Sequence, residues 1–259
     1  SRPINQIFSC HAILLSISLL LVTGCTQQDA EVLTEIPWAL ISQPVVIDTH
    51  THTRFSDGKY SVDDVVQFAI DHGCDALAIT DHSDLSEDAA SAGYFSAIKK
   101  AREKYPGFIL FGGLEWNIPP YGGREHVTVL VDPTLEETLL GTFKLQFEQD
   151  GAAADQGLQF LTEKITSADR AVLIYNHPSR KDDALDENIR DLINWRKSNL
   201  QVIGFEGAPG HQKMNPTGSY RGRFQTQDRW DPVTAEIGGV WDQLLDQGNN
   251  VWAALAVSD

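Results

Sequence analysis

The stretch that decides the fold is VVIDTHTHTRFSDG, residues 45–58, in which an apolar run passes directly into a His-x-His pair. Valine and isoleucine favour extended strands, and successive side chains of a strand point to opposite faces. His50 and His52 are therefore expected on the same side of the chain, where both imidazoles can approach one cation. A single pair of this kind is weak evidence, so its interpretation depends on the residues that follow.

Six further apolar runs of strand-like composition follow this one. They lie at residues 76–80, 108–114, 126–131, 171–175, 201–205 and 251–257. Helical periodicity is found between them at residues 62–72, 89–105, 156–168, 186–197 and 233–247. Ser61 and Asp64 are placed to form an N-cap box for the first of these helices. Alternating strands and helices are typical of a parallel α/β domain, and seven strands in this rhythm predict a barrel.

Most of the predicted strands end in residue types that bind metal ions. These residues are Asp48, His50 and His52 after the first strand, Asp81 and His82 after the second, Glu115 after the third, Asn176 and His177 after the fifth, and Asp259 after the last. The carboxyl ends of barrel strands form one face, so we expect these side chains to converge. His126 opens its strand instead, and its placement is less regular.

The residue types in this set indicate which metals the site would bind. Imidazole and carboxylate ligands without a thiolate suit zinc, manganese or iron, and a carboxylate can bridge two ions. Asp48, Asp81 and Asn176 are expected to orient the ligating histidines, with capping or turn formation as the alternative.

Taken together, these motifs resemble those of the PHP family, named for polymerase and histidinol phosphatase domains. The resemblance is carried by His50-Thr51-His52, Ser56-Asp57-Gly58, Ile79-Thr80-Asp81-His82, Gly113-Leu114-Glu115, His126, Asn176-His177-Pro178 and Ser258-Asp259. It implies an α/β fold, a distorted seven-stranded (β/α)7 barrel, with a centre of two to three divalent metal ions.

The resemblance also assigns ligands to each ion. By motif position, the ligands of the first ion would be His50, His52, Glu115 and Asp259. Those of the second would be Glu115, His126 and His177, and those of the third Asp57 and His82. In the family a histidine two residues after the last aspartate completes the third site. The sequence ends before that position, so we expect it to be truncated at its C-terminus.

The function that the resemblance implies is that of a metal-dependent hydrolase. The leading hypothesis is a phosphoesterase that cleaves small phosphate esters with metal-activated hydroxide. One alternative is a carbamate or carboxylic ester hydrolase on the same centre, because relatives resembling this family cleave such esters. The other alternative is a metal-binding domain without turnover.

Several polar residues near these motifs are candidates for substrate binding. Arg180 follows the Asn-His-Pro-Ser turn, Glu206 ends the sixth strand, and Arg221 and Arg223 lie in the irregular segment 207–232. The arginines are expected to hold a phosphate group, and the alternative for each is a solvated surface position. His211, in the same segment, is a candidate acid toward the leaving group, although such a histidine is more often simply exposed.

The charge of the chain limits the size of its ligands. Acidic residues outnumber basic ones by 36 to 20, which gives a formal net charge of −16. Such a surface repels polymeric nucleic acid, so we expect no partner of that class. A small anionic substrate remains compatible, because bound divalent cations would dominate the local field.

The N-terminus resembles a bacterial export signal. Residues 12–22 form an apolar run of signal-peptide length, followed by Val22-Thr23-Gly24-Cys25, which looks like a lipobox. We therefore expect a lipoprotein signal peptide at 1–24, lipidation of Cys25, a linker at 25–43 and the metallohydrolase domain at 44–259. The protein would be exported and held on a bacterial membrane, facing the periplasm or cell exterior, by its N-terminal lipid only. A buried helix ending in a Thr-Gly turn is the alternative.

Overall fold

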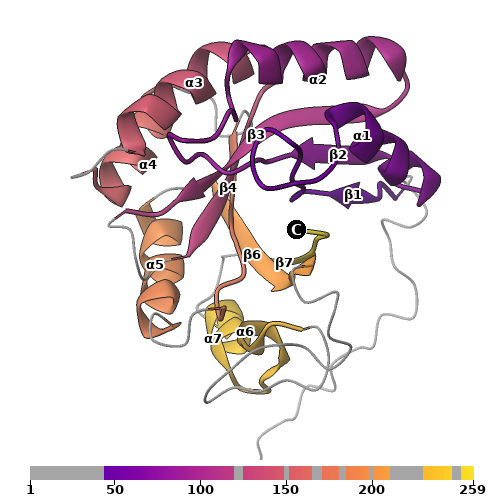
Figure 1. The fold of residues 1–259 in the computed structure, drawn as a ribbon. Coiled ribbons are helices and arrows are strands. Elements are labelled where there is room, and N and C mark those ends of the chain that lie inside the picture. The colour runs from indigo at the N-terminus through magenta and orange to yellow at the C-terminus, as the bar shows by residue number, and fades with distance from the viewer. Residues whose placement is uncertain are drawn as a thin grey trace, which may run out of the picture. The chain divides into compact units, whose positions relative to one another are not determined.

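The fold is built on one sheet whose strands follow each other in chain order. The computed structural model describes residues 44–119, 125–148, 152–164, 171–180, 185–198, 201–210, 230–246 and 252–259. The strands are β1 (Ile47–Asp48), β2 (Ala76–Ile79), β3 (Ile109–Asn117), β4 (His126–Val131), β5 (Ala171–Tyr175), β6 (Val202–Ala208) and β7 (Ala253–Ala256). The helices are α1 (Val62–Asp71), α2 (Ala92–Lys104), α3 (Glu136–Phe147), α4 (Ala154–Lys164), α5 (Leu185–Ser198), α6 (Pro232–Ala235) and α7 (Val240–Asp246) (Figure 1).

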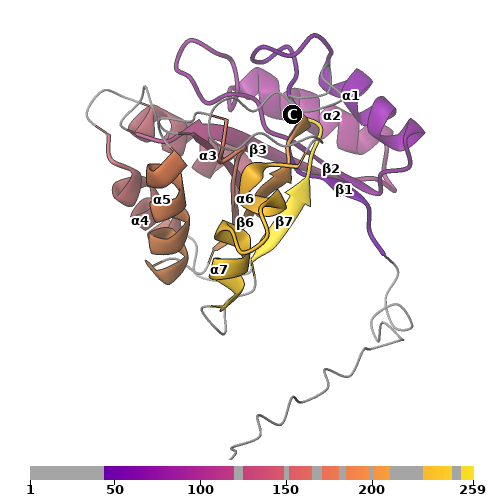
Figure 2. The same ribbon diagram turned by 90° about the horizontal axis from the view of Figure 1, so that it is seen from below.

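The first and last strands of the sheet approach each other, so the sheet curves into a barrel. The backbone N–H of Asp259, just beyond β7, donates to the carbonyl of His50 at 2.9 Å. The N–H of Ser258 donates to the carboxylate of Asp48 at 3.2 Å. Figures 1 and 2 accordingly show the C-terminus close to β1 and β2, with α1 and α2 on the outer side of the strands. The predicted distorted seven-stranded barrel is confirmed.

Strand β4 runs against both of its neighbours, whereas the remaining pairs of adjacent strands are parallel. The uniformly parallel sheet that the strand–helix alternation predicted is therefore wrong at this strand. Residues 118–125 are too few for the helical crossover that a parallel connection needs, so the chain reverses instead. The reversal brings the amino end of β4 to the edge where the other strands have their carboxyl ends. His126 reaches that edge for this reason.

Two helical regions differ from the expectation. Helix α3 was not predicted, because its buried face includes the charged residues Glu136 and Lys144 beside its leucines and phenylalanines. Glu136 accepts from both Nη atoms of Arg102, at 2.9 and 2.7 Å, which satisfies the buried carboxylate. The single helix predicted over 233–247 is divided into α6 and α7, because Gly238 adopts a φ of +73° between them.

Trp116 fixes the position of β3 against the helices. Its ring is fully buried, stacks 6.4 Å from Trp195 of α5 and meets Phe143 of α3 edge-on at 5.0 Å. Burial of such aromatic rings is a major source of core stability. Since successive side chains of a strand alternate, Glu115 must point to the opposite face, into the barrel.

Hydrogen bonds fix the start of α1, and they join Gly207 in β6 to Asp231. Ser61 and Asp64 form the predicted capping box at the start of α1. The N–H of Asp231 donates to the carbonyl of Gly207 at 2.7 Å, so the chain returns to its point of departure. The Asp231 carboxylate also accepts from the hydroxyl and N–H of Ser179.

Several sequence predictions fall on residues outside those that the structure describes. They concern Cys25 with the signal peptide and linker, and His211, Arg221 and Arg223. One compact unit runs from Pro44 to Asp259. None of the described helices has the length and apolar character needed to cross a membrane.

Candidate metal centre

Glu115 lies at the middle of a cluster of histidines inside the barrel, and its side chain is 1% exposed. Its Oε1 lies 2.7 Å from His126 Nδ1 and 3.0 Å from His177 Nε2, and it accepts from Asn176 Nδ2 at 3.0 Å. These partners come from the amino end of β4 and the carboxyl end of β5, which the antiparallel pairing brings together. The partners of this one carboxylate oxygen thus lie 11 to 62 positions farther along the sequence.

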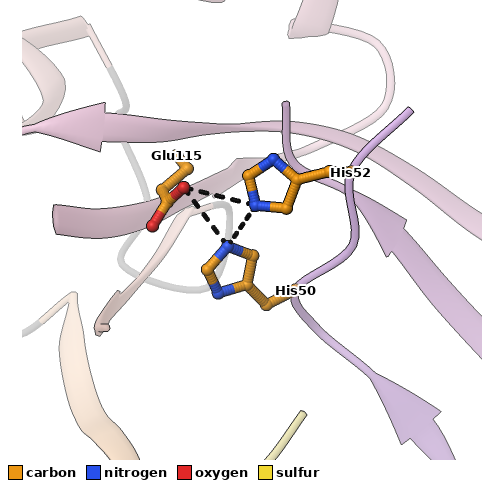
Figure 3. Close-up of side chains that lie close together, drawn as sticks. All are labelled: His50, His52 and Glu115. Atoms are coloured by element: carbon orange, nitrogen blue, oxygen red, sulfur yellow. Dashed lines mark hydrogen bonds and ion pairs between the residues drawn. The ribbon is translucent and has the colours of Figure 1, made fainter. Parts of the chain in front are cut away.

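The other oxygen of Glu115 faces three more imidazole nitrogens. His82 Nδ1 lies 2.8 Å away, His52 Nε2 3.3 Å and His50 Nε2 3.4 Å, yet Oε2 makes no hydrogen bond. The Nε2 atoms of His50 and His52 are themselves 2.8 Å apart (Figure 3). Two imidazole nitrogens this close cannot both carry a proton, and a cation between them would satisfy both lone pairs and the carboxylate.

The outer part of the cluster contains Asp57 and Asp259. Asp57 lies 3.1 Å from His52 Nδ1 and 3.8 Å from His82 Nε2. Asp259 Oδ1 lies 3.6 Å from the Nε2 atoms of both His50 and His52. The carboxylates therefore extend the cluster from the buried Glu115 toward solvent.

Three overlapping groups among the described residues could each hold a metal ion, with donor atoms within 4.8 Å of one another. They are His50, His52 and Glu115; His52, Asp57 and His82; and His82, Glu115 and His126. The donors are nitrogen and oxygen atoms, as zinc, manganese and iron accept. Six of the eight predicted ligands belong to these groups, and Glu115 is shared by two of them. The other two lie beside the groups: His177 Nε2 is 3.0 Å from Glu115, and Asp259 Oδ1 is 3.6 Å from His50 Nε2.

Glu206 holds two of the histidines from the side away from Glu115. It is fully buried, and its Oε1 lies 2.5 Å from His50 Nδ1 while its Oε2 accepts from the backbone N–H of His177 at 2.9 Å. A proton held on Nδ1 leaves the Nε2 of His50 free to act as a ligand. Glu206 was a candidate in the sequence to hydrogen-bond either substrate or a metal ligand, and the structure puts it in contact with two of the predicted ligands.

Glu125 was missed in the sequence, because a single glutamate beside His126 gives no spacing signal. It is fully buried, and its Oε2 accepts from His177 Nδ1 at 2.9 Å and from Arg180 Nη2 at 3.1 Å. His177 has a φ of +29°, a region that a residue with a Cβ adopts only when its surroundings hold it there. Glu125 and Glu206 both contact it.

The three residues expected to orient the histidines, Asp48, Asp81 and Asn176, differ from one another in the groups they contact. Asp81 accepts from the N–H and hydroxyl of Thr53 and from the hydroxyl of Ser56, and so orders the turn that carries Asp57. Asp48 accepts from the N–H of His50 and of Ser258. Asn176 donates to Glu115 and accepts from the N–H of Thr128.

The cluster is strongly negative when its histidines are neutral. Five carboxylates and one guanidinium touch the histidines, a net formal charge of −4, and two divalent ions would carry the opposite charge. Burial by itself lowers the pKa of His52, but the nearby Asp259, Asp57 and Glu115 carboxylates raise that pKa to about 12. The pKa of His177 is likewise lowered by burial but raised to about 9 by Glu115 and Glu125. Positive charge, as protons or as metal ions, is therefore needed for the site to be stable.

A seven-stranded α/β barrel with imidazole and carboxylate donors gathered at the carboxyl ends of its strands defines a metal-binding barrel protein. The model of the PHP domain family matches residues 48–207, and the chain belongs to this family.

Similar proteins have been named as phosphatases. A "Probable phosphatase" of Acetivibrio thermocellus is 35% identical over 79 residues, which cover 30% of this chain and 33% of that protein. A "Probable phosphatase" of Thermoanaerobacter pseudethanolicus is 36% identical over 75 residues, which cover 29% and 31%. The chain thus spans about a third of the length of these curated relatives.

Among solved structures, one similar protein comes from Bacteroides vulgatus. It is a two-domain protein containing a predicted PHP-like metal-dependent phosphoesterase. The sequence identity is 19% and the TM-score 0.43, with 66% of this chain and 48% of the other covered.

Proposed function

We propose that the protein is a metal-dependent phosphoesterase that cleaves small phosphate esters. The observation that carries the proposal is the buried Glu115 carboxylate with imidazole nitrogens of five histidines around it. Membership of the PHP domain family and the names of the partly matching relatives support the same reaction class. Zinc, manganese and iron are the metals proposed, since the donors are imidazoles and carboxylates.

The exposure of the cluster indicates how a substrate would enter. The side chains of His50 and His177 are essentially buried, whereas those of His82, Arg180 and Asp57 are 25%, 33% and 67% exposed. A substrate would therefore approach on the side of these three residues. The strongly acidic chain and the buried donors favour a small phosphate ester over a polymeric nucleic acid.

The residues of the chain have distinct parts in the proposed reaction. When bound, divalent ions lower the pKa of water and neutralise charge on phosphoryl oxygens. Glu115 and the histidines would hold such ions close together, while Arg180 would donate to a phosphate oxygen and orient the ester. Glu206 would keep the Nδ1 proton of His50 in place, so that Nε2 remains available.

The test is metal content and turnover of the protein expressed from its complete reading frame. Phosphate monoesters, phosphodiesters, aryl carboxylic esters and aryl carbamates are supplied with Mn²⁺ or Zn²⁺. We expect phosphate release that disappears on chelation and in His52→Ala. His72→Ala is the matched control, since His72 follows α1 and its ring hydrogen-bonds to the backbone carbonyl of Phe68. This control is expected to keep wild-type activity.

Other results would replace the proposal. Faster turnover of the carboxylic esters or carbamates than of any phosphate ester would assign the centre to that chemistry. Stoichiometric metal without turnover of any compound would identify a metal-binding domain.

We further propose that the protein is exported and lipid-anchored, on the support of the lipobox-like Val22-Thr23-Gly24-Cys25. Metabolic labelling with a fatty-acid analogue in a bacterial host is expected to mark the protein and not Cys25→Ser. Equal labelling of both, or of neither, would exclude lipidation at Cys25.

A further inference from the structure

Glu125 joins two functional parts of the candidate site through a single oxygen atom. Its Oε2 accepts from His177 Nδ1 at 2.9 Å, from Arg180 Nε at 3.2 Å and from Arg180 Nη2 at 3.1 Å. The side chain is fully buried, and a buried carboxylate is tolerated only with partners of this kind. We infer that Glu125 is a positioning residue that couples metal binding at His177 to phosphate binding at Arg180.

The first half of the coupling acts on His177. Because Nδ1 donates to Glu125, the unprotonated nitrogen is Nε2, which lies 3.0 Å from Glu115 Oε1. The backbone of His177 has a strained φ of +29° that only the surrounding contacts maintain, and the ring itself is held at Nδ1 by Glu125. Loss of the Glu125 contact therefore allows the ring to turn away from the metal donors.

The second half acts on Arg180, whose Nη2 lies 3.4 Å from His126 Nε2. Divalent ions bound by His126 and His177 would repel the Arg180 guanidinium toward solvent. One third of the Arg180 side chain is already exposed. The Glu125 carboxylate offsets this repulsion and fixes the guanidinium plane through Nε and Nη2. Nη1 then remains for a phosphate oxygen beside the ions.

The phosphate half of this inference rests on the proposed function, whereas the metal half does not. Both halves are measurable without turnover. Mn²⁺ affinity is determined by calorimetric titration of the chelator-treated protein, and inorganic phosphate affinity by titration of the Mn²⁺-loaded protein. The variants are Glu125→Gln, Arg180→Met and the double variant.

We expect Glu125→Gln to weaken Mn²⁺ binding by about tenfold, at the lower end of the effects of removing a partner of a metal-bound histidine. It should also weaken phosphate binding, by roughly fivefold, as a charge-assisted contact is lost. Arg180→Met should weaken phosphate binding at least as much, without weakening Mn²⁺ binding. The double variant should match Glu125→Gln for Mn²⁺ and Arg180→Met for phosphate, because the glutamate acts on phosphate through the arginine.

Glu136→Gln is the matched structural control. Glu136 is also a buried glutamate paired with an arginine, Arg102, but it lies at α3 outside the cluster. This variant should lower the thermal unfolding midpoint and leave both affinities unchanged. Glu125→Asp, which keeps the charge, should retain part of both affinities and serves if Glu125→Gln does not fold.

Three results would overturn the inference. They are unchanged affinities in Glu125→Gln, additive phosphate losses in the double variant, or equal affinity losses in Glu136→Gln. Absence of phosphatase turnover with these effects intact would remove the proposed function and leave the coupling standing. Absence of phosphate binding in the wild type would remove the Arg180 half.

Discussion

Replacing Asp81 should destabilise the protein more than any exposed aspartate does. The buried Asp81 carboxylate accepts from the Thr53 N–H and hydroxyl, both at 2.7 Å, and from the Ser56 hydroxyl at 2.6 Å. Hydrogen bonds to a charged group contribute about 1.5–3 kcal/mol each, and three bonds in one network contribute less than their sum. For Asp81→Ala we therefore expect a loss of about 4 kcal/mol in the free energy of unfolding.

Asp81→Asn separates geometry from charge. The amide oxygen can still accept from the N–H of Thr53 and from Ser56, and the amide nitrogen can donate to the Thr53 hydroxyl. Neutral hydrogen bonds are weaker than those to a carboxylate, so we expect a loss of about 1–2 kcal/mol. Asp63→Ala is the matched control, because Asp63 forms a surface ion pair with Lys104, worth about 1 kcal/mol or less.

The free energy of unfolding is measured by urea titration with chelator present, so that bound metal does not contribute. Fluorescence of the buried Trp116 and Trp195 reports the transition. A cost of Asp81→Ala below about 1 kcal/mol, the value of a single neutral hydrogen bond, would refute this role of Asp81. The role is also refuted if Asp81→Asn is as damaging as Asp81→Ala.

Three further predictions concern packing, capping and metal removal. In Gly157→Ala the new Cβ would lie 2.7 Å from the Trp116 ring, so thermal unfolding should show a loss of about 1–3 kcal/mol. Ser61→Ala should cost about 1 kcal/mol at pH 7. Hydrogen bonds from Ser61 hold the pKa of Asp64 below its usual 3.8. The cost of Ser61→Ala should therefore persist above pH 3.8 and shrink as the pH falls through the lowered pKa of Asp64. Urea titrations run from pH 7 downward measure this dependence. Mn²⁺ at a hundred times its Kd should raise the free energy of unfolding by about 2.7 kcal/mol, and chelator should abolish this gain. No gain with Mn²⁺ would argue against a native metal site.

Much of the barrel could be predicted from the sequence, because each strand is a short apolar run that ends in polar residues. The direction of β4 could not be predicted from composition, although the short stretch between Glu115 and His126 was a usable signal. Helix α3 escaped prediction because its buried Glu136 is satisfied by Arg102, a tertiary contact that periodicity does not reveal.

The candidate site was predictable where ligands follow strand ends, since topology brings those ends together. The residues that hold the histidines are harder to predict. Glu125 precedes a strand rather than following one, and its role depends on Arg180, 55 positions later in the sequence. Asp81 follows a strand, yet its partners Thr53 and Ser56 lie in another turn.

The hydrogen bond between Asp231 and Gly207 has a consequence for how this protein can change. Because the chain departs and returns at the same point, lengthening the segment between them adds a loop-closure entropy of about 0.6 kcal/mol per doubling. Asp231 also holds Ser179, the neighbour of Arg180, so the segment is tied to the side where a phosphate ester would enter. If the proposed function holds, we expect insertions and exchanges there to alter substrate preference during evolution, or by design, while the strands that carry the candidate ligands keep their register.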